Sequence, residues 1–398
     1  FRYKTIQDVR LVYVPNRQIG EFGGETDNWV WPRHTGDYSF MRAYVGKDGK
    51  PAKYAKDNIP YTPKKFLKVN PAGTNEEDFV FILGYPGRTF RHRPAQFIAY
   101  QQKYLLPYTS ELYDFQNTTM ENVGRNDKTT ALKLATRIKR NANVMKNYRG
   151  KLKGLNDINL VATKEKEDAE LAQFINNNVD IKAKYGTLMN DIDQLYKQIN
   201  GDVYRDMWFG QIYSSTSLLN VAKQLNSFKE ALNEQPLAQK NIFFNNNIQK
   251  LKQSLSMVYE AFEVDADRRI FKKMMIDASE FNTYQRVNAV DKVINRGSSN
   301  ETMINNYIND TFGLTKLKDK NYVFTNVLKS SKSIADYNDG LLLFEEDLAK
   351  QIAQLKPEKD RREGVLNKLM GDYVNVKEQF LKKNFVPDAN STLRLTYG

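Results

Sequence analysis

Proline and glycine are distributed unevenly along this 398-residue chain, and their distribution limits the folds that it can adopt. Residues 1–94 contain 8 of the 12 prolines and 9 of the 21 glycines, whereas residues 95–385 contain only 3 prolines and 11 glycines. Because both residue types interrupt helices, long helices are possible only in the second region. The sequence therefore predicts a β-rich segment over 1–94, a helical domain over 95–385 and a return to strand over 386–398, where Leu393, Leu395 and Tyr397 alternate.

Apolar periodicity refines this division. Short apolar runs predict strands near residues 9–14, 38–45, 65–69 and 79–83, with a hairpin-like turn at 47–50. In the second region two stripes advance by three or four positions, as one face of a helix does: Leu134, Ile138, Ala142, Met145, Tyr148 and Leu152, and Ile248, Leu251, Leu255, Val258 and Phe262. Breaks at 200–202, 234–236 and 296–300 predict antiparallel helices joined by short links.

The net charge of +13 raises the question of nucleic-acid binding. Lysine and arginine are, however, interleaved with 47 acidic residues along the helical stretches, which indicates solvated helix surfaces and no nucleic-acid partner. The chain has no cysteine and only two histidines, so we expect no disulfide, no zinc site and no cofactor. No run approaches the roughly 18 consecutive apolar residues of a membrane span.

Two long motifs in the first region suggest a function. The run from Phe22 to Tyr44 is a polar, aromatic-rich loop that leads through Asp37 into an alternating strand, and a second run extends from Asp78 to Arg91. Together they resemble the segments around the triad aspartate of the bacterial dipeptidyl-peptidases of the seven and eleven type. Members of that family are serine exopeptidases with a chymotrypsin-like double barrel and a large helical insertion.

The resemblance implies an α+β fold, in which a mostly α-helical domain is inserted into a chymotrypsin-like β-barrel domain that is only partly present. It also implies release of dipeptides from oligopeptides with a free N-terminus, export to the periplasm or cell surface, and an intact enzyme that can form a homodimer. The family's histidine precedes its aspartate and its serine follows well downstream, so the chain reads as an internal fragment that is inactive by itself.

Asp37 is the candidate catalytic residue. By resemblance it accepts the imidazole N–H of a histidine, which fixes the tautomer and stabilises the imidazolium. The alternative is an aspartate that caps the turn after Gly36. His34 is three residues away and points to the opposite face of an extended chain, so we expect a polar loop histidine and not the base.

Asn28 and Trp29 lie nine and eight residues before Asp37. In the resembled family the corresponding pair helps to hold the free α-amino group of the substrate, and the segment around Asn143 resembles a helix that supplies another amide to the same subsite. Ordinary aromatic packing is the alternative for Trp29 and for Trp31.

Two further interpretations concern the helical region. Asp265 and Asp267 are expected to be surface carboxylates paired with Arg268 or Arg269, because residues two apart diverge on a helix. The alternative to a peptidase is a non-enzymatic helical module that binds peptides or a partner protein, in which Asp37 is only structural.

Overall fold

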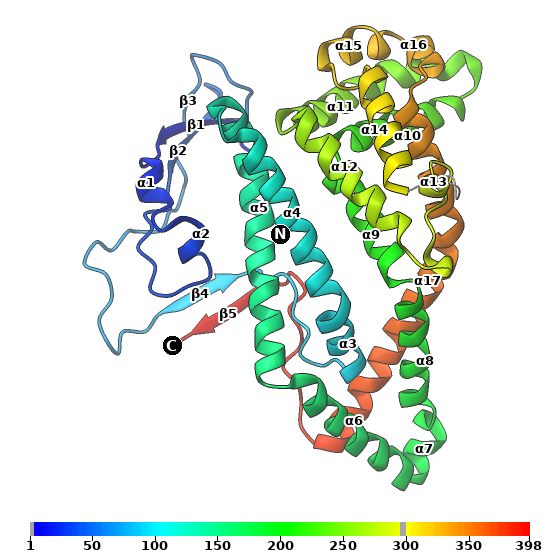
Figure 1. The fold of residues 1–398 in the computed structure, drawn as a ribbon. Coiled ribbons are helices and arrows are strands. Elements are labelled where there is room, and N and C mark those ends of the chain that lie inside the picture. The colour runs from blue at the N-terminus through cyan, green and yellow to red at the C-terminus, as the bar shows by residue number, and fades with distance from the viewer. Residues whose placement is uncertain (1–3, 295–299) are drawn as a thin grey trace. The chain divides into compact units, whose positions relative to one another are not determined.

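The computed structural model describes residues 4–294 and 300–398. The chain divides into two compact units (Figure 1), which we call the β unit (residues 1–89 and 388–398) and the helical unit (residues 90–387). The predicted boundaries were residues 94 and 385. The predominance of helices beside small sheets confirms the predicted fold class at this level, but the sheets of the described residues form no closed barrel.

The β unit contains two antiparallel sheets. Strands β1 (Asp8–Tyr13), β2 (Phe40–Val45) and β3 (Ile59–Pro60) form one sheet, and β4 (Phe81–Gly84) pairs with β5 (Arg394–Tyr397) in the other. The one-turn helices α1 (Arg17–Gly20) and α2 (Gly24–Asp27) lie between β1 and β2. Phe81 pairs with Tyr397, so the two ends of the helical unit connect to neighbouring strands of one sheet.

Three of the four predicted strands of the first region are confirmed. The segment 65–69 is not a strand: Leu67 is 95% exposed, and no neighbouring strand among the described residues offers backbone partners. The turn near 47–50 is confirmed, since the N–H of Gly46 donates to the carbonyl of Lys50 over 3.0 Å.

The β unit has a small apolar core. Among its described residues the buried apolar side chains are Pro15, Val45 and Ala389, while Phe81, Ile82 and Leu83 on both faces of β4 are exposed. A buried polar cluster connects β1 to the loop before β3: Arg10 and Asn58 donate hydrogen bonds to the Asp8 carboxylate. The hydrogen bond from Arg10 holds the pKa of Asp8 below its usual value.

The helical unit is built from many helices joined by short links. Its α-helices are α3 (Ala95–Tyr100), α4 (Leu106–Gly124), α5 (Lys128–Asp157), α6 (Leu160–Asn177), α7 (Val179–Tyr185), α8 (Leu188–Gly201), α9 (Val203–Ser215), α10 (Ser217–Asn233), α11 (Lys240–Glu260), α12 (Val264–Ser279), α13 (Asn288–Asp291), α14 (Asn300–Leu314), α15 (Lys320–Thr325), α16 (Ser331–Asp336) and α17 (Gly340–Leu381). Short 3₁₀ turns occur at η2 (Leu237–Gln239), η3 (Thr283–Gln285) and η4 (Val327–Lys329). None of the helices in the described residues is long and apolar enough to span a bilayer.

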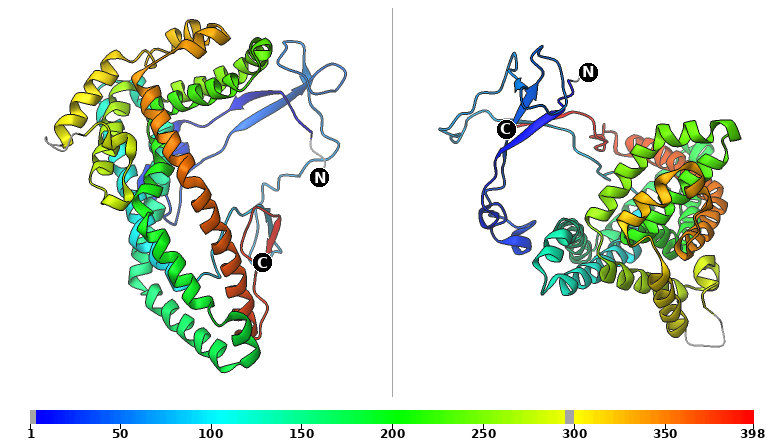
Figure 2. Two further views of the ribbon diagram at one scale, coloured as in Figure 1. Left: turned by 90° about the vertical axis from the view of Figure 1, so that its right-hand side faces the viewer. Right: turned by 90° about the horizontal axis from the view of Figure 1, so that it is seen from above.

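The long helix α17 joins two apolar clusters and runs along the helical unit (Figure 2). At 42 residues it spans about 63 Å. Its N-terminal part packs in the larger cluster, with α9–α16, and its C-terminal part packs in the smaller cluster, with α6–α8. Between the clusters its side chains are mostly exposed and charged, and Pro357 lies in this stretch.

The segment from α3 to α4 is one continuous helix with a wider turn inside it. A π-helical turn, η1 (Gln101–Leu105), connects the two, and Pro107 follows it at the start of α4. Proline lacks the N–H that would donate to the residue four positions earlier, and a π turn adjacent to it accommodates that missing bond.

The predicted helical stripes are confirmed. Leu134 and Ala142 are buried on α5, and Ile248, Leu251 and Leu255 are buried on α11. The predicted break at 200–202 separates α8 from α9, and the break at 234–236 precedes η2 and α11. The third break falls largely on residues 295–299, outside the described residues.

The prediction that Asp267 is a surface carboxylate is wrong, because its side chain is buried. It reaches from α12 to the first residues of α10, where it accepts hydrogen bonds from the N–H groups of Ser217 and Leu218. These donors have no partner within their own helix. Burial raises the pKa of Asp267, and the hydrogen bonds and the nearby Arg137 oppose that rise. Asp265, by contrast, is exposed and pairs with Arg268 as expected.

Asp267→Ala should lower the free energy of unfolding by about 2–4 kcal/mol, because two helix N–H groups and the buried Arg137 guanidinium lose an anionic partner. Urea denaturation followed by circular dichroism measures this change. Asp265→Ala is the matched control on the same helix and should change the free energy by less than about 0.5 kcal/mol. Equal losses for the two variants would contradict the assigned role of Asp267.

Amide hydrogen exchange should distinguish the two units. The backbone amides of β4 and β5 should exchange far faster than those of α9 and α10, because a two-stranded sheet with exposed faces opens readily. Mass spectrometry of exchanged peptides would measure the difference. Protection of β4 equal to that of α10 in a monomer would contradict this expectation.

Candidate functional site

The loop between β1 and β2 carries three of the predicted site residues, and glycine shapes its start. Gly23 begins α2 with a φ of +77°, and a Cβ at this position would lie 1.8 Å from the Asp27 carboxylate. Only glycine therefore fits here. The left-handed conformation of Gly23 precedes the single turn of α2, and Asn28 directly follows the C-terminal end of that turn.

Asn28 is oriented by a neighbouring carboxylate. Its Nδ2 donates to Glu25 Oε2 over 3.3 Å. An ionised carboxylate can only accept hydrogen bonds, so the amide nitrogen must be the atom that faces Glu25. The Oδ1 atom of Asn28 is then the acceptor end of the amide. Sequence reasoning missed Glu25, although an acidic residue three positions before a candidate amide was a usable signal.

Trp29 and Trp31 are not part of an aromatic core. Trp29 has a φ of +63°, an uncommon conformation for a residue with a side chain, and is 59% exposed. Trp31, which precedes Pro32 through a cis peptide bond, is 87% exposed. The loop thus presents two large, exposed aromatic side chains shortly after Asn28 in the sequence.

Asp37 is held at the end of this loop by its neighbours. The N–H of Gly36 donates to the carbonyl of Ile19 over 2.9 Å, and a Cβ on Gly36 would lie 2.9 Å from the Ile19 side chain. On the other side, the Tyr38 ring packs against Tyr13 and against Phe40 on β2. The Asp37 side chain is exposed and accepts no hydrogen bond from the described residues, so the predicted alternative of a turn cap is not seen.

Neither histidine forms a hydrogen bond with Asp37 among the described residues. His34 is exposed and meets Phe22 edge to face, with the ring centroids 6.5 Å apart. His92 hydrogen-bonds the Val386 carbonyl over 2.9 Å in the helical unit. Within the part of the chain that the structure describes, no three His, Asp or Glu side chains are grouped closely enough to hold a metal ion.

Asn143 lies on α5, where its side chain is exposed while the preceding Asn141 and Ala142 are buried. Asn28, Trp29 and Asp37 all lie on the loop between β1 and β2. Asn143 belongs to the helical unit, so no distance between it and Asn28 is defined. Its part in a common subsite stays a prediction.

The comparisons with known proteins agree with the resemblance. The family model for peptidase S46 matches residues 1–398. An Asp/Glu-specific dipeptidyl-peptidase of Capnocytophaga gingivalis is 30% identical over 404 residues, which cover 100% of this chain and 55% of the relative. A dipeptidyl-peptidase 7 of the same organism is 29% identical, with 100% and 54% covered. The chain thus spans about half the length of the curated relatives that it matches.

The fold matches a solved structure over nearly all of its length. The crystal structure of Porphyromonas endodontalis DPP11 in complex with the dipeptide Arg-Asp has a TM-score of 0.72 and 24% identity, and the match covers 99% of this chain and 55% of that one. At this identity the match concerns the fold alone. Because the family model matches the chain from end to end, the chain belongs to the peptidase S46 family.

Proposed function

We propose that this chain is part of a serine-type dipeptidyl-peptidase that releases dipeptides from the free N-terminus of oligopeptides. The observation that carries the proposal is the family match along all 398 residues, in which the relatives are named dipeptidyl-peptidases. The solved DPP11 complexes with dipeptides support the same class of substrate.

Asp37 would act as the orienting carboxylate of a Ser-His-Asp triad. Its exposed oxygens are available to accept the imidazole N–H of a histidine from the part of the protein outside these 398 residues. That hydrogen bond keeps the other imidazole nitrogen unprotonated, so that it can remove the proton of the serine hydroxyl. The charge of Asp37 then stabilises the imidazolium while the serine attacks the peptide carbonyl.

Asn28, Trp29 and Asn143 would hold the α-ammonium group of the substrate. With its nitrogen fixed by Glu25, Asn28 offers Oδ1 as an acceptor for the ammonium protons. The Trp29 ring lowers the local dielectric, which strengthens that charge-assisted hydrogen bond. A subsite that binds the ammonium two residues before the scissile bond would limit cleavage to dipeptides.

The exposed apolar faces of the β unit support a larger β domain of the chymotrypsin-like type. Phe79, Phe81, Leu395 and Tyr397 are all more than half exposed on the β4–β5 sheet, which is too small to be stable by itself. Further strands would cover these side chains. The proposal also includes export to the periplasm or the cell surface and a homodimeric intact enzyme, both taken from the resemblance.

Asp37→Asn in the complete protein should lower kcat by about 10⁴-fold, because an amide can stabilise the wrong histidine tautomer. KM should change little, since Asp37 does not contact the substrate in this proposal. Hydrolysis of a dipeptidyl fluorogenic substrate measures both constants. Asp48→Asn, in the exposed 47–50 turn, is the matched control and should be as active as the unchanged protein.

Asn143→Ala should lower kcat/KM for substrates with a free amine by about 10-fold or more, because one charge-assisted hydrogen bond to the ammonium is lost. Both the unchanged protein and the variant should cleave an N-terminally acetylated substrate poorly, and the substitution should lower that activity little further. Equal relative losses on the two substrates would mean that Asn143 serves only the fold. Asn147→Ala, one turn further along α5, tests whether any amide on this face suffices.

A further inference from the structure

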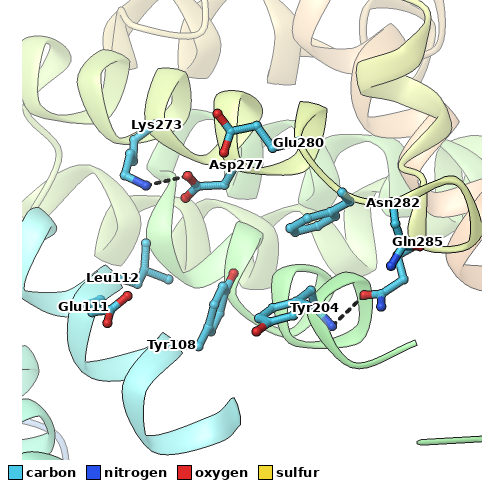
Figure 3. A pocket seen from close by; sticks show the side chains of 10 residues that line it. Tyr108, Glu111, Leu112, Tyr204, Lys273, Asp277, Glu280, Asn282 and Gln285 are labelled. Carbon is cyan, nitrogen blue, oxygen red and sulfur yellow. Dashed lines mark hydrogen bonds and ion pairs between the residues drawn. The ribbon is translucent and has the colours of Figure 1, made fainter. Parts of the chain in front are cut away.

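A cavity of about 620 Å³ lies inside the helical unit, between α4, the start of α9 and the end of α12 (Figure 3). Its volume is within the range of small-molecule and side-chain binding sites. It is formed within one unit, and none of the residues proposed above for peptidase chemistry lines it. The inference from it is therefore independent of the proposed function.

The cavity is acidic although the chain as a whole is basic. Lys273 and Asp277 are four positions apart on α12, so both project from the same face of that helix, and Glu280 directly follows its C-terminal end. Glu111 projects from α4. Three carboxylates thus share the cavity with one lysine, and that lysine pairs with Asp277. The lining carries an excess of two negative charges.

Asp277 is influenced by burial, by Lys273 and by the other two carboxylates of the cavity. Burial raises the pKa of Asp277, and the charges of Glu280 and Glu111 raise it further, while Lys273 opposes the rise. A bound cation would relieve the repulsion. Among the described residues no three His, Asp or Glu side chains are grouped closely enough to hold a metal ion.

Aromatic rings form another wall of the cavity. The Tyr204 ring stacks on Phe281, with centroids 6.2 Å apart and an interplanar angle of 29°, and it also meets Tyr108 at 6.5 Å. Tyr108 lies three residues before Glu111 on α4, so ring and carboxylate share one helix face. Aromatic rings attract a planar guanidinium group, and they can also pack against the aliphatic part of the side chain that carries it.

Gln285 supplies an independent indication of a ligand. It is 96% buried and lines the cavity, and its Oε1 accepts hydrogen bonds from the backbone N–H groups of Tyr204 and Arg205. Because those two N–H groups identify Oε1 as the acceptor end of the amide, the other end is the Nε2 group. Nε2 donates no hydrogen bond to any described residue, which leaves a donor available for a carbonyl oxygen of a ligand.

We infer that this cavity binds the arginine side chain of a peptide. The guanidinium group lies among Glu111, Asp277 and Glu280, the stem lies along the rings of Tyr108 and Tyr204, and a backbone carbonyl accepts a hydrogen bond from Gln285. A guanidinium group can donate five hydrogen bonds in a fixed plane, which suits several carboxylates better than the single ammonium of lysine does.

The test uses isothermal titration of the 398-residue chain with Nα-acetyl-arginine amide. Nα-acetyl-citrulline amide is the matched control ligand, since it has nearly the same shape and no charge. We expect the arginine compound to bind at least about tenfold more tightly, as charge-assisted hydrogen bonds would require. Equal binding of the two compounds, or no binding of the arginine compound at millimolar concentrations, would overturn the inference.

Substitutions of the lining residues should change the affinity for the arginine compound in opposite directions. Glu111→Gln and Asp277→Asn should each weaken binding of the arginine compound about fivefold to tenfold. Lys273→Met should strengthen it, because the competing cation of the cavity is removed. Asp265→Asn, an exposed carboxylate on the same helix, is the matched control and should leave the affinity unchanged.

Glu111 is exposed, so Glu111→Gln keeps the test decisive even where Asp277→Asn impairs folding. Circular dichroism and thermal melting check the fold of every variant. Weakening by Lys273→Met, or unchanged affinity in Glu111→Gln with the fold intact, would contradict the assigned cavity.

Discussion

The pairing of β4 with β5 constrains where the chain enters and leaves the helical unit. The strands are separated by the whole helical unit, yet Phe81 and Tyr397 are direct neighbours across one antiparallel ladder. The helices must therefore leave one sheet and return to it. Helix α17 provides the return, because it runs the length of the helical unit and packs in both apolar clusters (Figure 2).

Buried polar groups help to hold the helical unit together beside its apolar clusters. Arg137 on α5 donates to Gln116 on α4 and to the carbonyl of Ser215 at the end of α9, and Asp267 on α12 caps the start of α10. Such groups are stable in the interior only when their partners are present. The same contacts determine how α4, α9 and α12 meet, and hence the form of the acidic cavity between them.

Much of the fold could be predicted from the sequence because its signals are local. The scarcity of proline and glycine after residue 94 and the stripes on α5 and α11 follow from backbone sterics and helix geometry. The prediction failed at residues 65–69, where a short apolar run suggested a strand but no partner strand is available in the described residues. It also failed at Asp267, because burial depends on a helix that lies 50 residues away along the chain.

The candidate site likewise depends partly on local sequence and partly on contacts between residues that are distant in the sequence. The sequence by itself determined the loop that carries Asn28, Trp29 and Asp37, together with its family resemblance, since glycine at residues 23 and 36 and the run into β2 are local features. Only the tertiary structure decided that Glu25 orients Asn28 and that carboxylates from α4 and α12 surround one cavity. Hydrogen-bond orientation and charge clustering depend on distances between side chains, and those distances exist only after the chain has folded.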